Sequence, residues 1–229
     1  MLPELDKVKG IIFDLDGTLY RMRWYMRPFL TLMLFPHIMR LPRFLKIRGT
    51  YAGVEMESSD ALYKEVVKKL APIEKTSEET LLHWIDRHFY KAFVNVMFFL
   101  KNSRPHVNKT LQMLKQHGFK LAVLSDYDRI PERLDKLNID KSVFTIMTSS
   151  ESFGALKPSP APFNKIAENW NLDPSEVLVI GDRDDTDGEG ARGAGMKFIL
   201  LCNTRKKSTS LSWNETLNLL RNLPKTILR

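Results

Sequence analysis

The segment from Gly10 to Leu19 constrains the fold of this chain more than any other stretch. An apolar run leads into Asp14, Asp16 and a glycine turn, which is typical of a short buried strand. Carboxylates two residues apart point to the same side of an extended chain. They repel each other and lose water, so a cation or a hydrogen-bond network must compensate. We therefore expect a divalent ion with oxygen ligands, such as Mg²⁺, although Asp-Gly also occurs in ordinary turns.

From about Arg104 onward, strand-like and helix-like segments alternate along the chain. There the predicted strands are 119–124, 143–147, 177–180 and 198–201, and the predicted helices are 107–116, 131–137, 161–170, 188–194 and 213–220. One further strand, 9–14, is predicted at the start of the chain. This alternation predicts an α/β fold, a doubly wound parallel sheet with helices on both faces. Ligands in such sheets bind outside the carboxyl ends of the strands, where Asp14 and Asp16 are expected.

Residues 21–103 lack strand signals and read as an inserted all-helical domain. Ser58 or Ser59 caps a predicted helix that runs to about Leu70 and that Pro72 should stop. Thr76, with Glu79 at capping-box spacing, should begin a long second helix. The predicted domains are therefore an α/β core of residues 1–20 and 104–229 and a helical cap of residues 21–103.

The first part of the insertion, residues 21–48, interleaves arginines with large apolar side chains. Its longest uncharged stretch is too short to cross a bilayer. We expect its apolar side chains to pack on the helix of residues 77–101, with one or more of Arg21, Arg23 and Arg27 facing the cleft. The alternative is contact with a membrane surface.

Polar residues also follow the later strands of the predicted sheet. Ser125 and Asp126 follow one strand and could hold a phosphate oxygen, although a capped turn would look the same. Lys157, set between a glycine turn and prolines, could balance carboxylates and a phosphate, or be a solvated lysine. After the next strand, Asp182 begins a run with four aspartates up to Asp187, and one of them would complete a metal site with Asp14.

Composition bounds the protein class. The chain has 229 residues and a net charge of +8. Its single cysteine, Cys202, excludes an internal disulfide and is expected to be a buried structural thiol. The charge would attract anions, but no nucleic-acid-binding pattern is present, so we expect no nucleic-acid partner. The polar residues before the first strand do not resemble a secretory signal, and we expect a cytoplasmic protein.

The sequence resembles the haloacid dehalogenase superfamily of hydrolases, in its phosphatase branch. The resemblance is carried by Phe13-Asp14-Leu15-Asp16-Gly17-Thr18-Leu19, by Ser125, by Lys157-Pro158-Ser159-Pro160, and by Gly181-Asp182-Arg183 through Asp187 with the glycines and alanines up to Met196. It covers the core domain, and the insertion resembles the helical cap called type 1.

The resemblance implies roles for these residues. Asp14 would be the nucleophile that forms an aspartyl-phosphate, and Asp16 the acid and base. Mg²⁺ would be held by Asp14, the backbone carbonyl of Asp16, and Asp182. The phosphate would be bound by Ser125, Asp126 and Lys157. Thr18 and Asp187 would orient the residues that contact the metal and the phosphate, without contacting either themselves.

These roles predict a Mg²⁺-dependent phosphatase that acts on a small phosphorylated metabolite, as a monomer or weak homodimer. The same residues could serve a phosphomutase, and a catalytically silent binding protein is a further alternative. A dehalogenase would not need Asp16.

Overall fold

The computed structural model describes residues 3–100, 103–202 and 210–227. Its centre is one six-stranded sheet in the order β3-β2-β1-β4-β5-β6, with every neighbouring pair parallel. The strands are β1 (Gly10–Phe13), β2 (Lys120–Ser125), β3 (Ile146–Ser149), β4 (Val177–Gly181), β5 (Lys197–Leu201) and β6 (Ser210–Leu211). The expected doubly wound parallel sheet is confirmed.

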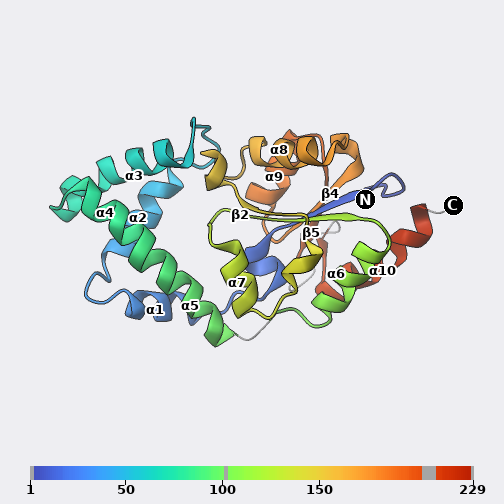
Figure 1. Ribbon diagram of the computed structural model, residues 1–229, viewed down its shortest axis with the longest axis horizontal. Coiled ribbons are helices and arrows are strands. Elements are labelled where there is room, and N and C mark those ends of the chain that lie inside the picture. Colours follow the sequence, from blue (N-terminus) through green and yellow to red (C-terminus); the bar gives the residue numbers. More distant parts are fainter. Residues whose placement is uncertain (1–2, 101–102, 203–209, 228–229) are drawn as a thin grey trace.

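Helices cover both faces of the sheet (Figure 1). In that view α8 (Ala161–Trp170) and α9 (Glu189–Gly193) lie above it, and α6 (Val107–Gln116), α7 (Ile130–Lys136) and α10 (Trp213–Ile227) lie below it. Side chains of β1 alternate between the faces: Ile12 packs with Phe163 of α8, whereas Ile11 and Phe13 belong to the larger core beneath. Burial on both faces explains why the central strands β1 and β4 are continuous apolar runs.

Five further helices form a lobe beside the sheet, at the end of the molecule opposite the two termini (Figure 1). They are α1 (Met26–Met33), α2 (Arg40–Gly49), α3 (Ser59–Glu74), α4 (Glu78–Trp84) and α5 (Tyr90–Leu100), with a helical turn (Ile85–Phe89) joining the last two. The two chain segments that enter and leave the lobe lie side by side, because Tyr20 and Ser103 form an antiparallel bridge. This pairing falls at the expected domain boundary, but the division into domains stays a prediction.

Some expected helix boundaries in the lobe are wrong. Pro72 lies inside α3 and does not stop it; only two helical residues follow, so one missing N–H bond removes little of the helix. The helix ends where Lys75 adopts a left-handed conformation. The cap of α4 is Ser77 rather than Thr76, because the Ser77 hydroxyl accepts the backbone N–H of Thr80 at 3.2 Å.

Two expectations for the core also change. Val143, the expected start of a strand, instead ends a helical turn (Lys141–Val143), in which the Asp140 carboxylate accepts the backbone N–H of Ser142 at 3.0 Å. The strand β3 begins three residues later, at Ile146. Cys202 is half-buried rather than buried, since it follows the last residue of β5. Within the described ranges, no helix has the length and apolar character needed to cross a membrane. The cytoplasmic location and the oligomeric state stay predictions.

Candidate active site

The strand order places the acidic residues at one point of the sheet edge. The chain runs from β1 through β2 to β3, then crosses back to β4 on the other side of β1, and this reversal opens a crevice at the carboxyl ends of β1 and β4. Asp14 follows β1 and its backbone N–H donates to the carbonyl of Ile180 at 2.9 Å. Asp182 follows β4 directly. The two carboxylates are therefore neighbours because their strands are neighbours.

Lys157 holds Asp14 through a buried ion pair. Its ammonium donates to Asp14 Oδ1 at 2.9 Å, to Asp187 Oδ1 at 2.7 Å and to the carbonyl of Leu124 at 2.8 Å. Thr18 donates to the other Asp14 oxygen at 2.9 Å. Burial alone would lower the pKa of Lys157, but the carboxylates of Asp14 and Asp187 raise it, so the lysine is a fixed cation beside the expected nucleophile.

Asp14, Asp182 and Asp187 form a compact acidic cluster. One carboxylate oxygen of each lies within 4.8 Å of the others. Burial, and then the charges of Asp187 and Asp16, raise the pKa of Asp182 to about 6. Burial also raises the pKa of Asp14, and Lys157 only partly opposes this effect. Converging carboxylate oxygens, two of them buried and that of Asp182 half-buried, carry excess negative charge and fit a hard divalent cation, which would relieve their repulsion.

Gly17 is required by the close approach of Asp182. A Cβ at this position would lie 2.0 Å from Asp182 Oδ2, and the backbone φ of Gly17 is +92°. Both the space and the conformation exclude a side chain. The glycine of the first motif thus allows the loop that carries Asp16 to lie directly against Asp182.

Asp16 has three donors of its own. Arg133 of α7 forms an ion pair with Oδ1, to which the Tyr20 hydroxyl also donates at 2.5 Å, and Ser125 donates to Oδ2 at 2.8 Å. Burial raises the pKa of Asp16, but the charge and hydrogen bonds of Arg133, with those of Tyr20 and Ser125, outweigh this and lower it. In this arrangement Asp16 is a carboxylate that accepts hydrogen bonds.

The polar side-chain atoms of two residues expected to contact phosphate already form hydrogen bonds with other protein groups. The Ser125 side chain is fully buried, and besides donating to Asp16 it accepts from Arg133 Nη1 at 3.0 Å. Asp126 lines the cavity described below while its Oδ1 accepts the backbone N–H of Lys157 at 3.0 Å. Asp126 thus positions the lysine loop, and the contact of either residue with phosphate stays a prediction.

Sequence reasoning missed the residues that support this site from other elements. Arg133 is fully buried and falls on the apolar stripe of its helix between Ile130 and Leu137. An arginine at such a position is the signal that could have found it, because a buried cation requires a partner. Arg104 is also buried and donates to the carbonyls of Thr18 at 3.0 Å and Gly17 at 2.6 Å, but a lone arginine before Pro105 gives no comparable signal.

A cavity of about 300 Å³ opens over the acidic cluster. Its floor includes Asp14, Asp16, Lys157 and Asp182. The wall on the lobe side is mostly apolar and consists of Met22, Met26, Arg27, Leu30, Leu45, Phe89 and Phe93. A larger hollow of about 490 Å³ lies between α5 and α7 and contains none of the sheet-edge residues. The smaller cavity is thus the candidate active site, with Arg27 as the lobe's cation in it.

Comparisons with known proteins agree with this geometry. The model of the haloacid dehalogenase-like hydrolase family matches residues 8–195. Glyceraldehyde 3-phosphate phosphatase of Methanocaldococcus jannaschii is 30% identical over 95% of this chain and 99% of that protein. Phosphoglycolate phosphatase of Aquifex aeolicus is 38% identical, but the match covers only 42% of this chain and 45% of that protein. The crystal structure of 2-haloacid dehalogenase from Pseudomonas syringae has the same fold, with a TM-score of 0.64 and 23% identity over 97% of this chain and 99% of that one.

Proposed function

The chain belongs to the haloacid dehalogenase-like hydrolases, and on that basis we propose that it is a phosphatase that hydrolyses small phosphomonoesters with Asp14 as the nucleophile. The observation that carries the proposal is the Asp14 carboxylate on the cavity floor, 2.9 Å from the Lys157 ammonium and within the acidic cluster. The relatives named as phosphatases of glyceraldehyde 3-phosphate and phosphoglycolate support a small phosphorylated substrate.

Mg²⁺ is the cofactor that best fits this donor set. Asp14, Asp182 and the backbone carbonyl of Asp16 would hold it, and it would cancel the repulsion between these carboxylates and the substrate phosphoryl group. Asp187 already accepts from Lys157 at 2.7 Å, so its role is to keep the lysine in place.

The reaction would proceed in two displacements. An Asp14 oxygen attacks phosphorus as the bond to the ester oxygen breaks, and the leaving oxygen takes a proton from Asp16. Asp16 is a carboxylate in the arrangement described above, so it must take up one proton from solvent before this step. Water then attacks the phosphorus of the aspartyl-phosphate, Asp16 takes a proton from that water, and the Asp14 carboxylate is released with inorganic phosphate. Lys157 stabilises negative charge throughout, because it is fixed before the substrate arrives.

Phosphate release from a panel of esters tests this function. We expect release from glyceraldehyde 3-phosphate, phosphoglycolate or p-nitrophenyl phosphate in the presence of Mg²⁺, and loss of release in EDTA. Asp14→Asn should lower turnover by about a thousandfold or more. The matched control is Asp184→Asn, a half-buried aspartate of the acidic loop that pairs with Arg192 at 3.0 Å and does not line the cavity.

The control should retain activity within a few-fold of the unchanged protein. Absence of phosphate release from every ester, or release that Asp14→Asn leaves intact, would refute the proposed function. Transfer of phosphate between sugar hydroxyls without release would indicate a phosphomutase instead.

A further inference from the structure

Helix α1 presents a wide apolar surface, of which only part is buried. Met26 and Leu30 pack into the core. Phe29, Leu32 and Met33, which are three and four residues apart and extend this apolar surface beside the buried residues, are exposed, Leu32 to 69%. Arg27 and Thr31 occupy the polar side of this helix, so its apolar surface is wider than the part that the core buries. The expected packing of residues 21–48 on the long helix is therefore found for part of this surface only.

The exposed face continues into a row of aromatic rings, which we call the aromatic strip. It consists of Trp24, Tyr25, Phe29, Phe99 and Phe98, in that order. Successive ring centroids are 5.9, 6.1, 5.5 and 5.8 Å apart. Trp24 is 86% exposed, and Phe35, beyond α1, is 76% exposed. Single exposed apolar residues are common on protein surfaces, but a contiguous patch marks a contact site.

The charge around the aromatic strip has one sign. The sequence contains no aspartate or glutamate between Asp16 and Glu55. Arg21, Arg23 and Arg27 are exposed, and within the described part of the chain none of them has a carboxylate within ion-pair distance. Arg40 and Arg43 of the same segment, in contrast, pair with Glu74 of α3. The uncompensated cations thus gather beside the apolar rings.

This surface also borders the candidate active site. Met22 is 53% exposed and at the same time lines the cavity. Arg27 and Leu30 of α1 line it as well. A partner bound to the aromatic strip would therefore lie next to one wall of the cavity.

We propose that the aromatic strip and the exposed face of α1 dock on an anionic lipid bilayer. Amphipathic aromatic side chains prefer the interface between lipid and water, and exposed arginines are attracted to anionic headgroups. A short helix with this composition lies in the interface and does not cross it. A second copy of the chain fits less well, because a two-fold contact here would bring these arginines close to their own copies.

Tryptophan fluorescence reads this contact directly. The chain has four tryptophans, and Trp84, Trp170 and Trp213 are buried. The full chain is mixed with vesicles of equal parts phosphatidylglycerol and phosphatidylcholine, or of phosphatidylcholine alone, with brominated acyl chains as quencher. We expect co-sedimentation and quenching with the anionic vesicles, a loss of about tenfold in partitioning from 0.1 to 1 M salt, and no quenching in Trp24→Phe.

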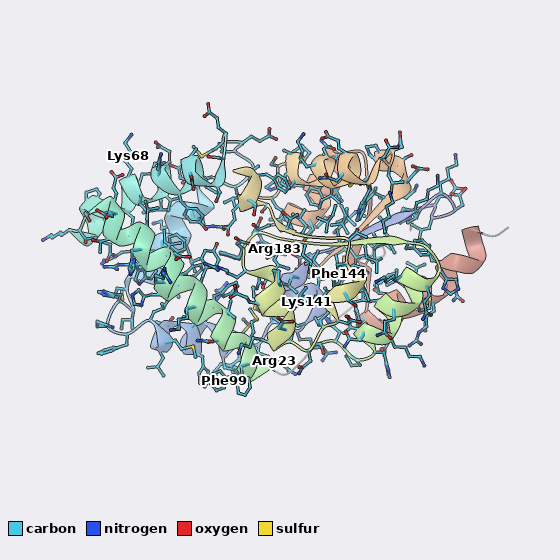
Figure 2. All side chains as sticks on the ribbon, in the orientation of Figure 1. Arg23, Lys68, Phe99, Lys141, Phe144 and Arg183 are labelled. Carbon is cyan, nitrogen blue, oxygen red and sulfur yellow. The ribbon has the colours of Figure 1, made fainter. Side chains whose placement is uncertain are left out.

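A charge-reversal pair provides the control. Arg23→Glu should lower partitioning about tenfold or more, whereas Lys68→Glu on α3 should leave it unchanged. Figure 2 shows Arg23 and Phe99 along the lower edge of the molecule and Lys68 at its upper edge. Unchanged melting temperatures would show that both variants fold.

Three results would overturn the proposal. They are equal sedimentation with neutral and anionic vesicles, anionic binding that Arg23→Glu and Lys68→Glu weaken alike, and a stable dimer in light scattering that Trp24→Ala dissociates. The last result would assign the surface to a second copy of the chain.

Discussion

The substitution Arg133→Met removes the ion pair that holds Asp16 and leaves the other residues of the site in place. Arg133 is fully buried, and its guanidinium pairs with Asp16, whose side chain is 17% exposed. The same group donates to the carbonyl of Tyr127 at 2.9 Å and lies 4.6 Å from the ring centre of Phe93. Methionine keeps an unbranched apolar stem against that ring while it removes the charge and every donor.

The magnitude follows from the burial of the pair. Removing one partner of a buried ion pair leaves the other charge uncompensated, which costs about 3–5 kcal/mol of the free energy of unfolding. Tyr20 and Ser125 still donate to Asp16, so we expect the carboxylate to shift rather than to leave the site. A displacement of this kind lowers turnover about a hundredfold.

Arg129→Met is the matched control, one helical turn earlier. Arg129 pairs with Asp86 at 2.5 Å, but the two side chains are 41% and 49% exposed, so we expect a loss of at most about 1 kcal/mol. Urea unfolding followed by circular dichroism gives the two free energies, and phosphate release gives the two turnover numbers. Arg133→Lys, which keeps the charge but not the forked donor, should recover part of both losses.

Equal stability losses in Arg133→Met and Arg129→Met would refute the reasoning about burial. Unchanged turnover in a folded Arg133→Met would refute the positioning role, because Asp16 would then act without its cation.

Three other perturbations test separate parts of the structure. Gly17→Ala should weaken Mg²⁺ binding about tenfold or more in titration calorimetry, because the added Cβ would lie 2.0 Å from an Asp182 oxygen; unchanged affinity would contradict the close approach. Asp182→Ala should lower Mg²⁺ affinity far more than Asp16→Ala, since the expected Asp16 ligand is its backbone carbonyl; equal losses would contradict that division of roles. For Glu74, burial would raise the pKa of the carboxyl group, but hydrogen bonds and charges from Arg43 and Arg40 lower it. The two ion pairs therefore stabilise the fold at pH values above the ordinary glutamate pKa. This stabilisation is lost as the pH falls through the lowered pKa of Glu74. The stability difference from Glu74→Gln is about 1.5–3 kcal/mol at neutral pH, because the side chains of Glu74 and its partner Arg40 are only 10% and 8% exposed. It should disappear in acid, and a difference that persisted in acid would contradict this reasoning.

The sequence predicted the sheet and the residues around the cavity floor because both depend on local patterns. Each of Asp14, Asp182 and Ser125 is adjacent to or ends an apolar run, and the ends of parallel strands meet at one edge. The glycine and prolines around Lys157 were equally compatible with a solvated lysine, and the resemblance of Lys157-Pro158-Ser159-Pro160 to the family motif selected it. The structure brings these side chains together, while their chemical roles stay predictions.

The partners of Asp16 could not be predicted in the same way. Arg133 reaches it from a helix whose position depends on packing against the sheet, and no spacing along the chain encodes that distance. The same holds for α1: the composition of residues 21–48 indicated an amphipathic segment, but which apolar face would be buried is decided by contacts with distant helices. Pro72 was misjudged because its effect depends on its place within the last helical turn.

The position of β1 has a consequence for folding during synthesis. Gly10 pairs with Lys120 on one side and with Val177 on the other. Of the six described strands, β1 is therefore synthesised first and waits longest for both of its neighbours. The whole helical lobe is translated before β2, and β4 comes later still. At about 5–20 residues per second, β1 therefore spends several seconds as an apolar segment with two unpaired edges. We expect this stretch, and not the lobe that follows it, to be the part of the nascent chain that chaperones bind.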